Sequence, residues 1–237
     1  MPTIVVNDIN MYYEVHGEGE PLVLIGGLSN DVSDYARMIP ELAQRYRVIA
    51  FDNCGAGRTD KPDAPYSIDM MASDAASLLS ALGVEHAHIL GVSMGGRIAI
   101  ALTLAHPELV KSLILVSTFA RRIPLTRRGI FRLDNPLMRL LRAMGNTYPQ
   151  PHYAFLRQLQ ASRNYDATDR LGEIRAPTLI LHGRNDHLAP FALAEEMRAG
   201  ISGSQLIAFD GGHIFLFLQQ KQFLAAVIAF LASQSKT

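Results

Sequence analysis

Short apolar runs alternate with longer amphipathic stretches along most of this 237-residue chain. The apolar runs are bounded by turn-forming residues, as buried β-strands are, and the stretches between them carry apolar positions at helical spacing. Strands that alternate with helices predict an α/β fold with a largely parallel sheet covered on both faces. The predicted strands are 22–25, 48–51, 88–92, 112–117, 178–181 and 205–209, and the predicted helices are 34–45, 67–82, 94–105, 191–198 and 221–233.

Two regions depart from this alternation. At the start, residues 3–6 and 11–15 flank the turn-forming segment 7–10 and predict an antiparallel hairpin. Residues 119–172 are rich in Arg, Pro, Leu and aromatics, with helical patches at 137–144 and 153–161. We therefore predict a single core formed by residues 1–118 and 173–237, with 119–172 inserted over the sheet as an Arg-rich cap.

Composition narrows the class of protein. Lys plus Arg and Asp plus Glu each number 22, so the net charge gives no argument for binding nucleic acid or an anionic membrane. Cys54 is the single cysteine, which excludes an internal disulfide. The N-terminus lacks a basic leader with an apolar segment, and the longest apolar run, 223–232, is too short to cross a bilayer. We expect a soluble, cytoplasmic protein with neither a nucleic acid nor a membrane as partner.

The candidate chemistry begins at Gly91-Val92-Ser93-Met94-Gly95, between a predicted strand and a predicted helix. In a G-x-S-x-G sequence at such a junction, the serine occupies a sharp, strained turn and the glycines let strand and helix approach closely. Ser93 would then lie at the carboxyl end of the sheet, where open α/β sheets bind ligands. An incidental serine in a glycine-rich turn is the alternative, but the flanking strand and helix favour a nucleophile.

A serine hydroxyl needs a base that removes its proton and an acid that orients the base. Among the eight histidines, His213 lies in an Asp-Gly-Gly-His sequence that follows a strand and precedes an apolar helix. Asp186 follows the predicted strand at 178–181, which gives the order Ser, Asp, His that accompanies this serine motif. Asp210 is a rival for the acid because it is close to His213 in sequence, but it is more typical of a strand end.

The negative charge that develops when an alcohol attacks a carbonyl needs preorganised N–H donors. Met94, at the start of the predicted helix, and Leu28, just beyond Gly26-Gly27, are the candidate backbone donors, with Ser29 as a hydroxyl helper. A phosphate-binding loop is the alternative for these glycines, but neither G-x-G-x-x-G nor G-x-x-x-x-G-K-[ST] occurs. No nearby carboxylate or cysteine cluster completes a metal site around His86-Ala-His88, so we expect neither metal nor cofactor.

Five stretches of the chain together resemble the α/β-hydrolase superfamily, in particular its 3-oxoadipate enol-lactonase-like and carboxylesterase branch. The resemblance implies an eight-stranded, mostly parallel sheet flanked by helices, with a short helical cap after the sixth strand. The sequence departs from the family at Gly26-Gly27, where His-Gly is usual, and at Cys54 and Thr59, where the family usually reads Asp-x-Arg-Gly-x-Gly-x-Ser. The five stretches are 22–27, 52–59, 91–96, 177–186 and 211–213.

Ser93, His213 and Asp186 predict a serine hydrolase that cleaves carboxylic esters or lactones through an acyl-enzyme on Ser93. Asp186 would fix the tautomer of His213 and stabilise its imidazolium. Two alternatives stay open. The same three residues could serve a cofactor-free perhydrolase or a C–C hydrolase, because the bond that breaks depends on what the pocket presents to the serine. A non-catalytic receptor of the same fold could also retain them.

The arginines of 119–172 bear on the substrate. The segment has ten Arg, no Lys and three acidic residues. Guanidinium groups there could bind a carboxylate of an anionic ester or lactone, or an acyl carrier protein, or they could form a solvated helical face. The candidate arginines are Arg121, Arg122, Arg127, Arg128, Arg132, Arg139 and Arg142. The residues predicted to line the substrate pocket are Ser29, Tyr35, Phe119, Leu137, Met138, Phe155 and Ile214.

Overall fold

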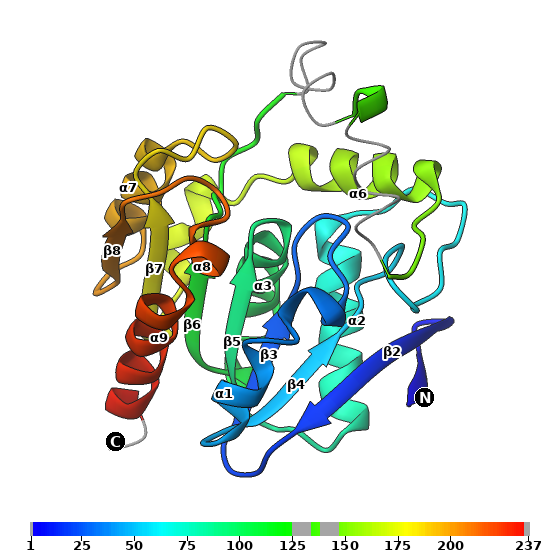
Figure 1. Cartoon of the computed structure of the whole chain (residues 1–237), viewed down its shortest axis with the longest axis horizontal. Helices are drawn as coiled ribbons and strands as arrows, with labels where there is room; N and C mark the ends of the chain where they lie inside the picture. Colours follow the sequence, from blue (N-terminus) through cyan, green and yellow to red (C-terminus); the bar gives the residue numbers. More distant parts are fainter. Residues whose placement is uncertain (1, 125–133, 138–146, 235–237) are drawn as a thin grey trace.

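The computed structural model describes residues 2–124, 134–137 and 147–234. Its strands form one eight-stranded sheet in the order β1-β2-β4-β3-β5-β6-β7-β8, as Figure 1 shows. The β1–β2 and β2–β4 pairs are antiparallel and every other pair is parallel, which confirms the predicted hairpin and the mostly parallel sheet. The strands are β1 Thr3–Val6, β2 Ile9–His16, β3 Pro21–Ile25, β4 Arg47–Phe51, β5 Ala87–Val92, β6 Val110–Val116, β7 Thr178–Gly183 and β8 Gln205–Phe209.

Helices cover both faces of this sheet (Figure 1). Along β3, Val23 and Ile25 join the core that contains α2, α3 and α7, whereas Leu22 and Leu24 join the core beneath α1 and α9. The two-residue side-chain period of a strand therefore supplies both apolar layers. The α-helices are α1 Ile39–Ala43, α2 Ile68–Ala81, α3 Met94–Ala105, α6 His152–Asn164, α7 Phe191–Gly200, α8 Phe215–Leu218 and α9 Gln220–Gln234, and the short 3-10 helices are η1 Val32–Tyr35, η2 Pro107–Leu109 and η3 Thr168–Glu173.

Two predicted boundaries are wrong for identifiable reasons. The hairpin turn is tighter than 7–10, because Asn7 and Asp8 both adopt positive φ and Val6 pairs directly with Ile9. The single helix predicted at 34–45 is divided into η1 and α1. Pro40, near the start of α1, has no N–H to donate to the preceding turn, so a continuous helix cannot pass through it.

The long apolar run near the C-terminus lies in α9, as expected of a core helix. Five of its side chains are buried against the sheet, namely Phe223, Leu224, Val227, Phe230 and Leu231. Among the residues that the structure describes, no helix has the length and apolar character needed to cross a membrane.

The segment between β6 and β7 is described in part. The helical patch predicted at 153–161 falls within α6, which lies across the carboxyl ends of the central strands (Figure 1). Most of the patch predicted at 137–144 lies outside the described residues. The division into a core and an inserted cap stays a prediction, but α6 is placed where it can contribute side chains to a site at this edge of the sheet.

Candidate active site

Ser93 occupies a strained turn between β5 and α3. Its φ is 54°, a left-handed conformation that non-glycine residues rarely adopt and that costs about 1–3 kcal/mol. The turn is held from outside, because the Ser93 N–H donates to the Val116 carbonyl at 2.8 Å and the Thr118 hydroxyl donates to the Ser93 carbonyl at 2.6 Å. A Cβ on Gly95 would lie 2.1 Å from the Ile25 carbonyl oxygen, so this close approach of α3 to β3 requires glycine.

The turn aims the Ser93 hydroxyl at an imidazole. Ser93 Oγ lies 3.0 Å from His213 Nε2, and His213 Nδ1 lies 2.8 Å from Asp186 Oδ2. With Nδ1–H donating to the carboxylate, Nε2 is free to accept the serine proton. The structure therefore brings the three predicted residues together from the carboxyl ends of β5, β7 and β8, although 120 residues separate Ser93 from His213.

The Asp186 carboxylate is buried and fully engaged. Burial alone would raise its pKa, but the hydrogen bond and charge of His213, with the N–H groups of Ala189 and Leu188, bring the pKa below the usual range. Those two N–H groups donate to Oδ1 at 2.9 Å and 2.8 Å. Asp210, the rival acid, has an almost fully exposed side chain 3.9 Å from Arg184. Of the two aspartates, it is thus Asp186 that contacts the imidazole.

Two further side chains surround this hydrogen-bonded chain and were missed from sequence. The Ser117 hydroxyl donates to the His213 carbonyl at 2.9 Å and so fixes the loop after β8. His182, fully buried, donates from Nε2 to the Ala189 carbonyl at 2.7 Å and lies 3.5 Å from Asp186 Oδ2. Burial lowers the pKa of His182, which favours the neutral form of the ring beside the carboxylate. The position of His182 at the end of a buried predicted strand was the feature of the sequence that could have indicated this role.

The loop after β3 lies against the serine turn. A Cβ on Gly27 would be 3.3 Å from the Ser93 Cβ, and both Leu28 and Met94 line the cavity in front of Ser93. Among the described residues, neither the Leu28 N–H nor the Met94 N–H has a hydrogen-bond partner in the protein. Both predicted donors are therefore available to a ligand atom at the serine.

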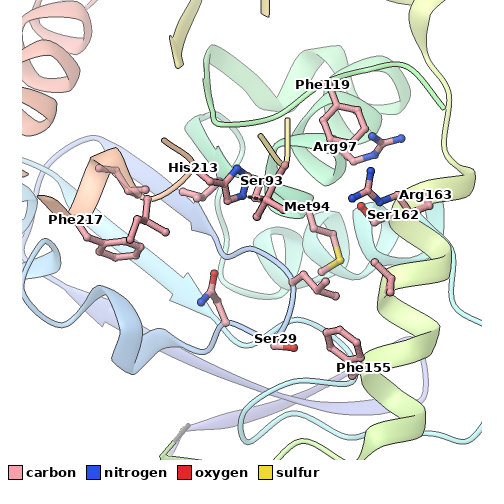
Figure 2. A pocket seen from close by; sticks show the side chains of 17 residues that line it. Ser29, Ser93, Met94, Arg97, Phe119, Phe155, Ser162, Arg163, His213 and Phe217 are labelled. Carbon is pink, nitrogen blue, oxygen red and sulfur yellow. Dashed lines mark hydrogen bonds between the residues drawn. The ribbon is translucent and has the colours of Figure 1, made fainter. Parts of the chain in front are cut away.

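The residues in front of Ser93 enclose a cavity of about 490 Å³. Four predicted pocket residues line it: Ser29, Phe119, Phe155 and Ile214. The Ser29 side chain is engaged within the protein, because its hydroxyl donates to Gln150 Oε1 at 2.6 Å. Figure 2 shows that the lining comes from the turn at Ser93, the loop after β3, α6 and the region around α8.

Two predicted pocket residues do not line the cavity, and a third lies outside the described residues. Tyr35 is wrong, because it is only 2% exposed and lies beneath the loop, where its hydroxyl accepts the Gly27 N–H at 3.3 Å. Leu137 is also wrong, since its side chain is 59% exposed and does not line the cavity. A residue type does not specify the direction of its side chain, which the sequence alone therefore leaves open. Met138 lies outside the described residues.

The cavity contains two arginines that sequence reasoning did not select, Arg97 from α3 and Arg163 from α6. Among the predicted arginines, Arg121 is exposed and forms an ion pair with Glu196. The Arg122 N–H donates to Asp166, and its side chain is also exposed. The others, Arg127, Arg128, Arg132, Arg139 and Arg142, lie outside the described residues.

Comparison with known proteins identifies the family. Residues 20–156 match the family described as the alpha/beta hydrolase fold. This chain belongs to that family. Within it, the chain is 30% identical to RutD of Azorhizobium caulinodans, whose name proposes carbamate hydrolysis, over 97% of this chain and 98% of the relative.

Two further α/β-hydrolase relatives carry more specific names. The chain is 31% identical to the 2-hydroxymuconate semialdehyde hydrolase of Pseudomonas sp. strain CF600, over 91% of this chain and 88% of the relative. The crystal structure of the enol-lactonase from Burkholderia xenovorans LB400 superposes with a TM-score of 0.88 at 25% identity, covering 98% of this chain and 100% of that one. This α/β-hydrolase is therefore similar to enzymes that break different bonds.

The two departures from the family pattern are supported locally. The Gly27 N–H also donates to Asn30 Oδ1 at 3.2 Å, and Asn53 Nδ2 donates to the Gly26 carbonyl at 2.9 Å. Thr59 keeps its hydroxyl in place by donating to the Asp52 carbonyl at 2.6 Å. The side chains of Asn30 and Asn53 thus hold the loop that carries Leu28. Among the described residues, no group of three or more His, Cys, Asp or Glu side chains is arranged to hold a metal ion.

Proposed function

We propose that this α/β-hydrolase cleaves carboxylic esters or lactones through an acyl-enzyme on Ser93. The observation that carries the proposal is the continuous hydrogen-bonded chain from Ser93 Oγ through His213 to Asp186, which opens into a cavity. A hydroxyl 3.0 Å from an imidazole that is itself anchored by a buried carboxylate has the arrangement that nucleophilic catalysis requires.

In the first half of the reaction, Ser93 Oγ attacks the carbonyl carbon of the substrate while its proton passes to His213 Nε2. The imidazolium that forms is stabilised by the Asp186 carboxylate. The carbonyl oxygen becomes an oxyanion, which the N–H groups of Leu28 and Met94 would bind. Each such donor contributes about 3 kcal/mol to the stability of a transition state.

In the second half, the tetrahedral intermediate collapses and the bond to the leaving oxygen breaks as His213 returns its proton to that oxygen. An alcohol departs from an ester, whereas a lactone opens and its hydroxyl stays attached. A water then loses a proton to His213 and attacks the acyl carbon. Collapse of the second intermediate releases the carboxylic acid and restores the Ser93 hydroxyl.

The cavity and the relatives support an oxygen ester or lactone of modest size. A volume of about 490 Å³ lies within the range of small-molecule sites, and aromatic and aliphatic side chains such as Phe155, Leu159 and Phe217 supply much of the lining. The enol-lactonase from Burkholderia xenovorans LB400, which superposes over nearly the whole chain, acts on a lactone by its name. We expect such a small molecule to be the substrate; binding of an acyl carrier protein stays a prediction.

The decisive experiment is turnover of p-nitrophenyl acetate and p-nitrophenyl butyrate by the wild type, Ser93→Ala and a matched control. Ser80→Ala removes an exposed hydroxyl from α2. We expect release of p-nitrophenol by the wild type and Ser80→Ala, and a loss of at least about 10³-fold in Ser93→Ala. Equal rates in all three proteins would contradict the nucleophile. No turnover by the wild type, with ligand binding retained, would favour the receptor alternative.

C–C bond hydrolysis is the second candidate, favoured by the relative named 2-hydroxymuconate semialdehyde hydrolase. The same base and oxyanion donors could assist attack on a ketone carbonyl, with a carbon leaving group in place of oxygen. Loss of the visible absorbance of 2-hydroxymuconate semialdehyde would measure this activity. A kcat/KM for that compound well above those for esters and lactones would replace the ester proposal. The kcat/KM for a small carbamate, compared with those for esters and lactones, would test the carbamate hydrolysis that the name of RutD proposes.

A further inference from the structure

A second imidazole lies against the carboxylate of Asp186. His182 is near the carboxyl end of β7, four residues before the aspartate, and its side chain is fully buried. Its Nε2 lies 3.5 Å from Asp186 Oδ2, the oxygen to which His213 Nδ1 donates at 2.8 Å. Two imidazoles therefore meet at one carboxylate oxygen, one from the loop after β8 and the other from the strand itself.

The surroundings of His182 select its tautomer. Nε2 is 2.7 Å from the Ala189 carbonyl, which can only accept a hydrogen bond, so Nε2 carries a proton. Nδ1 is buried, and among the described residues it has no hydrogen-bond partner. A second proton on Nδ1 would be a buried donor without an acceptor, which is unfavourable. The geometry therefore favours a neutral ring whose N–H lies on the side of Asp186, and burial, which lowers the pKa of His182, acts in the same direction.

The His182 N–H acts on Asp186 in two ways. Its hydrogen bond to the Ala189 carbonyl closes the turn whose Leu188 and Ala189 N–H groups donate to Asp186 Oδ1. At Oδ2, a neutral donor stabilises the carboxylate charge. A carboxylate stabilised in this way attracts the imidazolium of His213 less strongly, so His213 gives up its proton at a lower pH. His182 thus bears on the position of the acid and on the basicity of the base.

Several charged groups surround this carboxylate, but two of them act on His182, namely Asp186 and His213. Helix α7 packs the uncharged ring of Phe191 against His182, and α8, which follows His213, has no charged side chain. Further titratable side chains on the facing elements are exposed on the two loops (Arg184, His187 and Asp210) or line the cavity (Arg97 and Arg163). None of these side chains changes in the variants described below.

Resting on the proposed function, we propose that His182 is a positioning residue of the active site: it holds the Asp186 carboxylate against His213 and limits the basicity that this carboxylate gives to His213. His182 acts through the aspartate alone, because it is fully buried and does not line the cavity that holds Ser93. The consequence is that His213 Nε2 can accept the serine proton at a lower pH than it could beside an aspartate without this donor.

The test separates the N–H of His182 from the bulk of its ring. His182→Leu fills similar space without a donor, whereas His182→Gln returns an amide N–H near the position of Nε2. The pH dependence of kcat/KM for p-nitrophenyl acetate gives the measurement, because its acid limb reports the ionisation of the base in the free enzyme. In His182→Leu we expect this limb to move to higher pH by about 0.5 unit, a threefold loss on the limb, and kcat to fall about tenfold as the acid loses its position. His182→Gln should restore most of both.

His88→Leu is the matched control. His88 is also a fully buried histidine on a central strand, but it lies at the amino end of β5, where it contacts the Ser112 hydroxyl. Its replacement removes the same imidazole and should leave the acid limb where it is in the wild type. If His182→Leu does not fold, His182→Asn replaces it, because the shorter amide reaches the position of Nδ1 and also lacks a donor toward Asp186.

An acid limb that stays in place in His182→Leu, or that moves equally in His88→Leu, would overturn the proposal, as would a failure of His182→Gln to restore it. If the wild type hydrolyses no ester, the proposed function fails, and an NMR titration of the His213 imidazole then decides the role of His182 without turnover. We expect His213 to titrate at a higher pH in His182→Leu than in the wild type and His182→Gln. The same titration in all three proteins would show that His182 has no influence on His213.

Discussion

The two ends of the cavity differ in how the protein satisfies their polar groups. At the catalytic end, the chain from Ser93 to Asp186 is hydrogen-bonded at every step, and the loops that carry it are fixed by side chains from neighbouring strands. At the other end, Arg97 keeps a buried Nε without a partner and Arg163 has no polar partner in the described residues. The fold thus satisfies the polar groups of the catalytic end more completely than those of the arginine end.

The largest effect should come from breaking the catalytic end at its acid. Asp186→Asn would present an amide N–H to His213 Nδ1, favouring the tautomer that cannot accept the serine proton, and should lower kcat by about 10⁴-fold. Asp210→Asn is the control, because that aspartate is close to His213 in sequence but exposed. The kcat values for p-nitrophenyl acetate give the measurement, and equal losses in both variants would contradict the assignment of Asp186.

A smaller effect should follow from removing the amide that ties α6 to the catalytic loops. Gln158 is fully buried; it accepts the Ser29 N–H at 3.1 Å and donates to the Cys54 carbonyl at 2.8 Å. Gln158→Leu leaves both groups buried and unpaired, which should lower the free energy of unfolding by about 2–3 kcal/mol in urea titrations. Gln160→Leu, exposed on the same helix, should change it by less than about 0.5 kcal/mol. A similar cost for both would argue against this tie.

Tyr35→Phe should act more weakly on the same end. The lost hydroxyl accepts from Gly27, but Asn30 continues to accept that N–H, so the loop before Leu28 keeps one of two supports. We expect a loss of about 1 kcal/mol of transition-state stabilisation, roughly fivefold in kcat/KM. Tyr46→Phe removes a phenol that has no hydrogen bond in the described residues and should leave kcat/KM unchanged. If Tyr46→Phe lowered kcat/KM as much as Tyr35→Phe does, the result would contradict a specific role of the Tyr35 hydroxyl.

The smallest change should appear at the arginine end, with the opposite sign. Arg163→Met removes a half-buried charge that faces another positive charge, and should raise the free energy of unfolding by about 0.5 kcal/mol. Arg157→Met instead breaks an ion pair with Asp63 and should lower it slightly. Urea titrations of both variants would measure the difference. Marked destabilisation by Arg163→Met would mean that the Arg163 side chain makes stabilising contacts, as the catalytic side chains do, and would contradict the difference between the two ends of the cavity.

Much of the fold could be predicted because its pattern is local. Apolar runs such as 48–51 and 88–92 became β4 and β5 with small changes at their ends, since burial on both faces of a parallel sheet demands apolar runs. The helix predicted at 34–45 failed because periodicity outweighed Pro40. The convergence of Ser93, Asp186 and His213 could also be predicted, because each follows a parallel strand at its carboxyl end; their catalytic roles stay predictions.

The sequence by itself determined which residues lie at the carboxyl edge of the sheet, because parallel strands carry that information in their order and length. Only the tertiary structure decided which side chains face the cavity. Arg97 sits in an apolar helix, and its inward direction depends on the carbonyls of Arg121 and Tyr165, which distant segments bring to it. Tyr35 and Phe155 are both aromatic, yet one supports a loop and the other lines the cavity. Side-chain direction is set by packing partners far along the chain, and no local pattern records them.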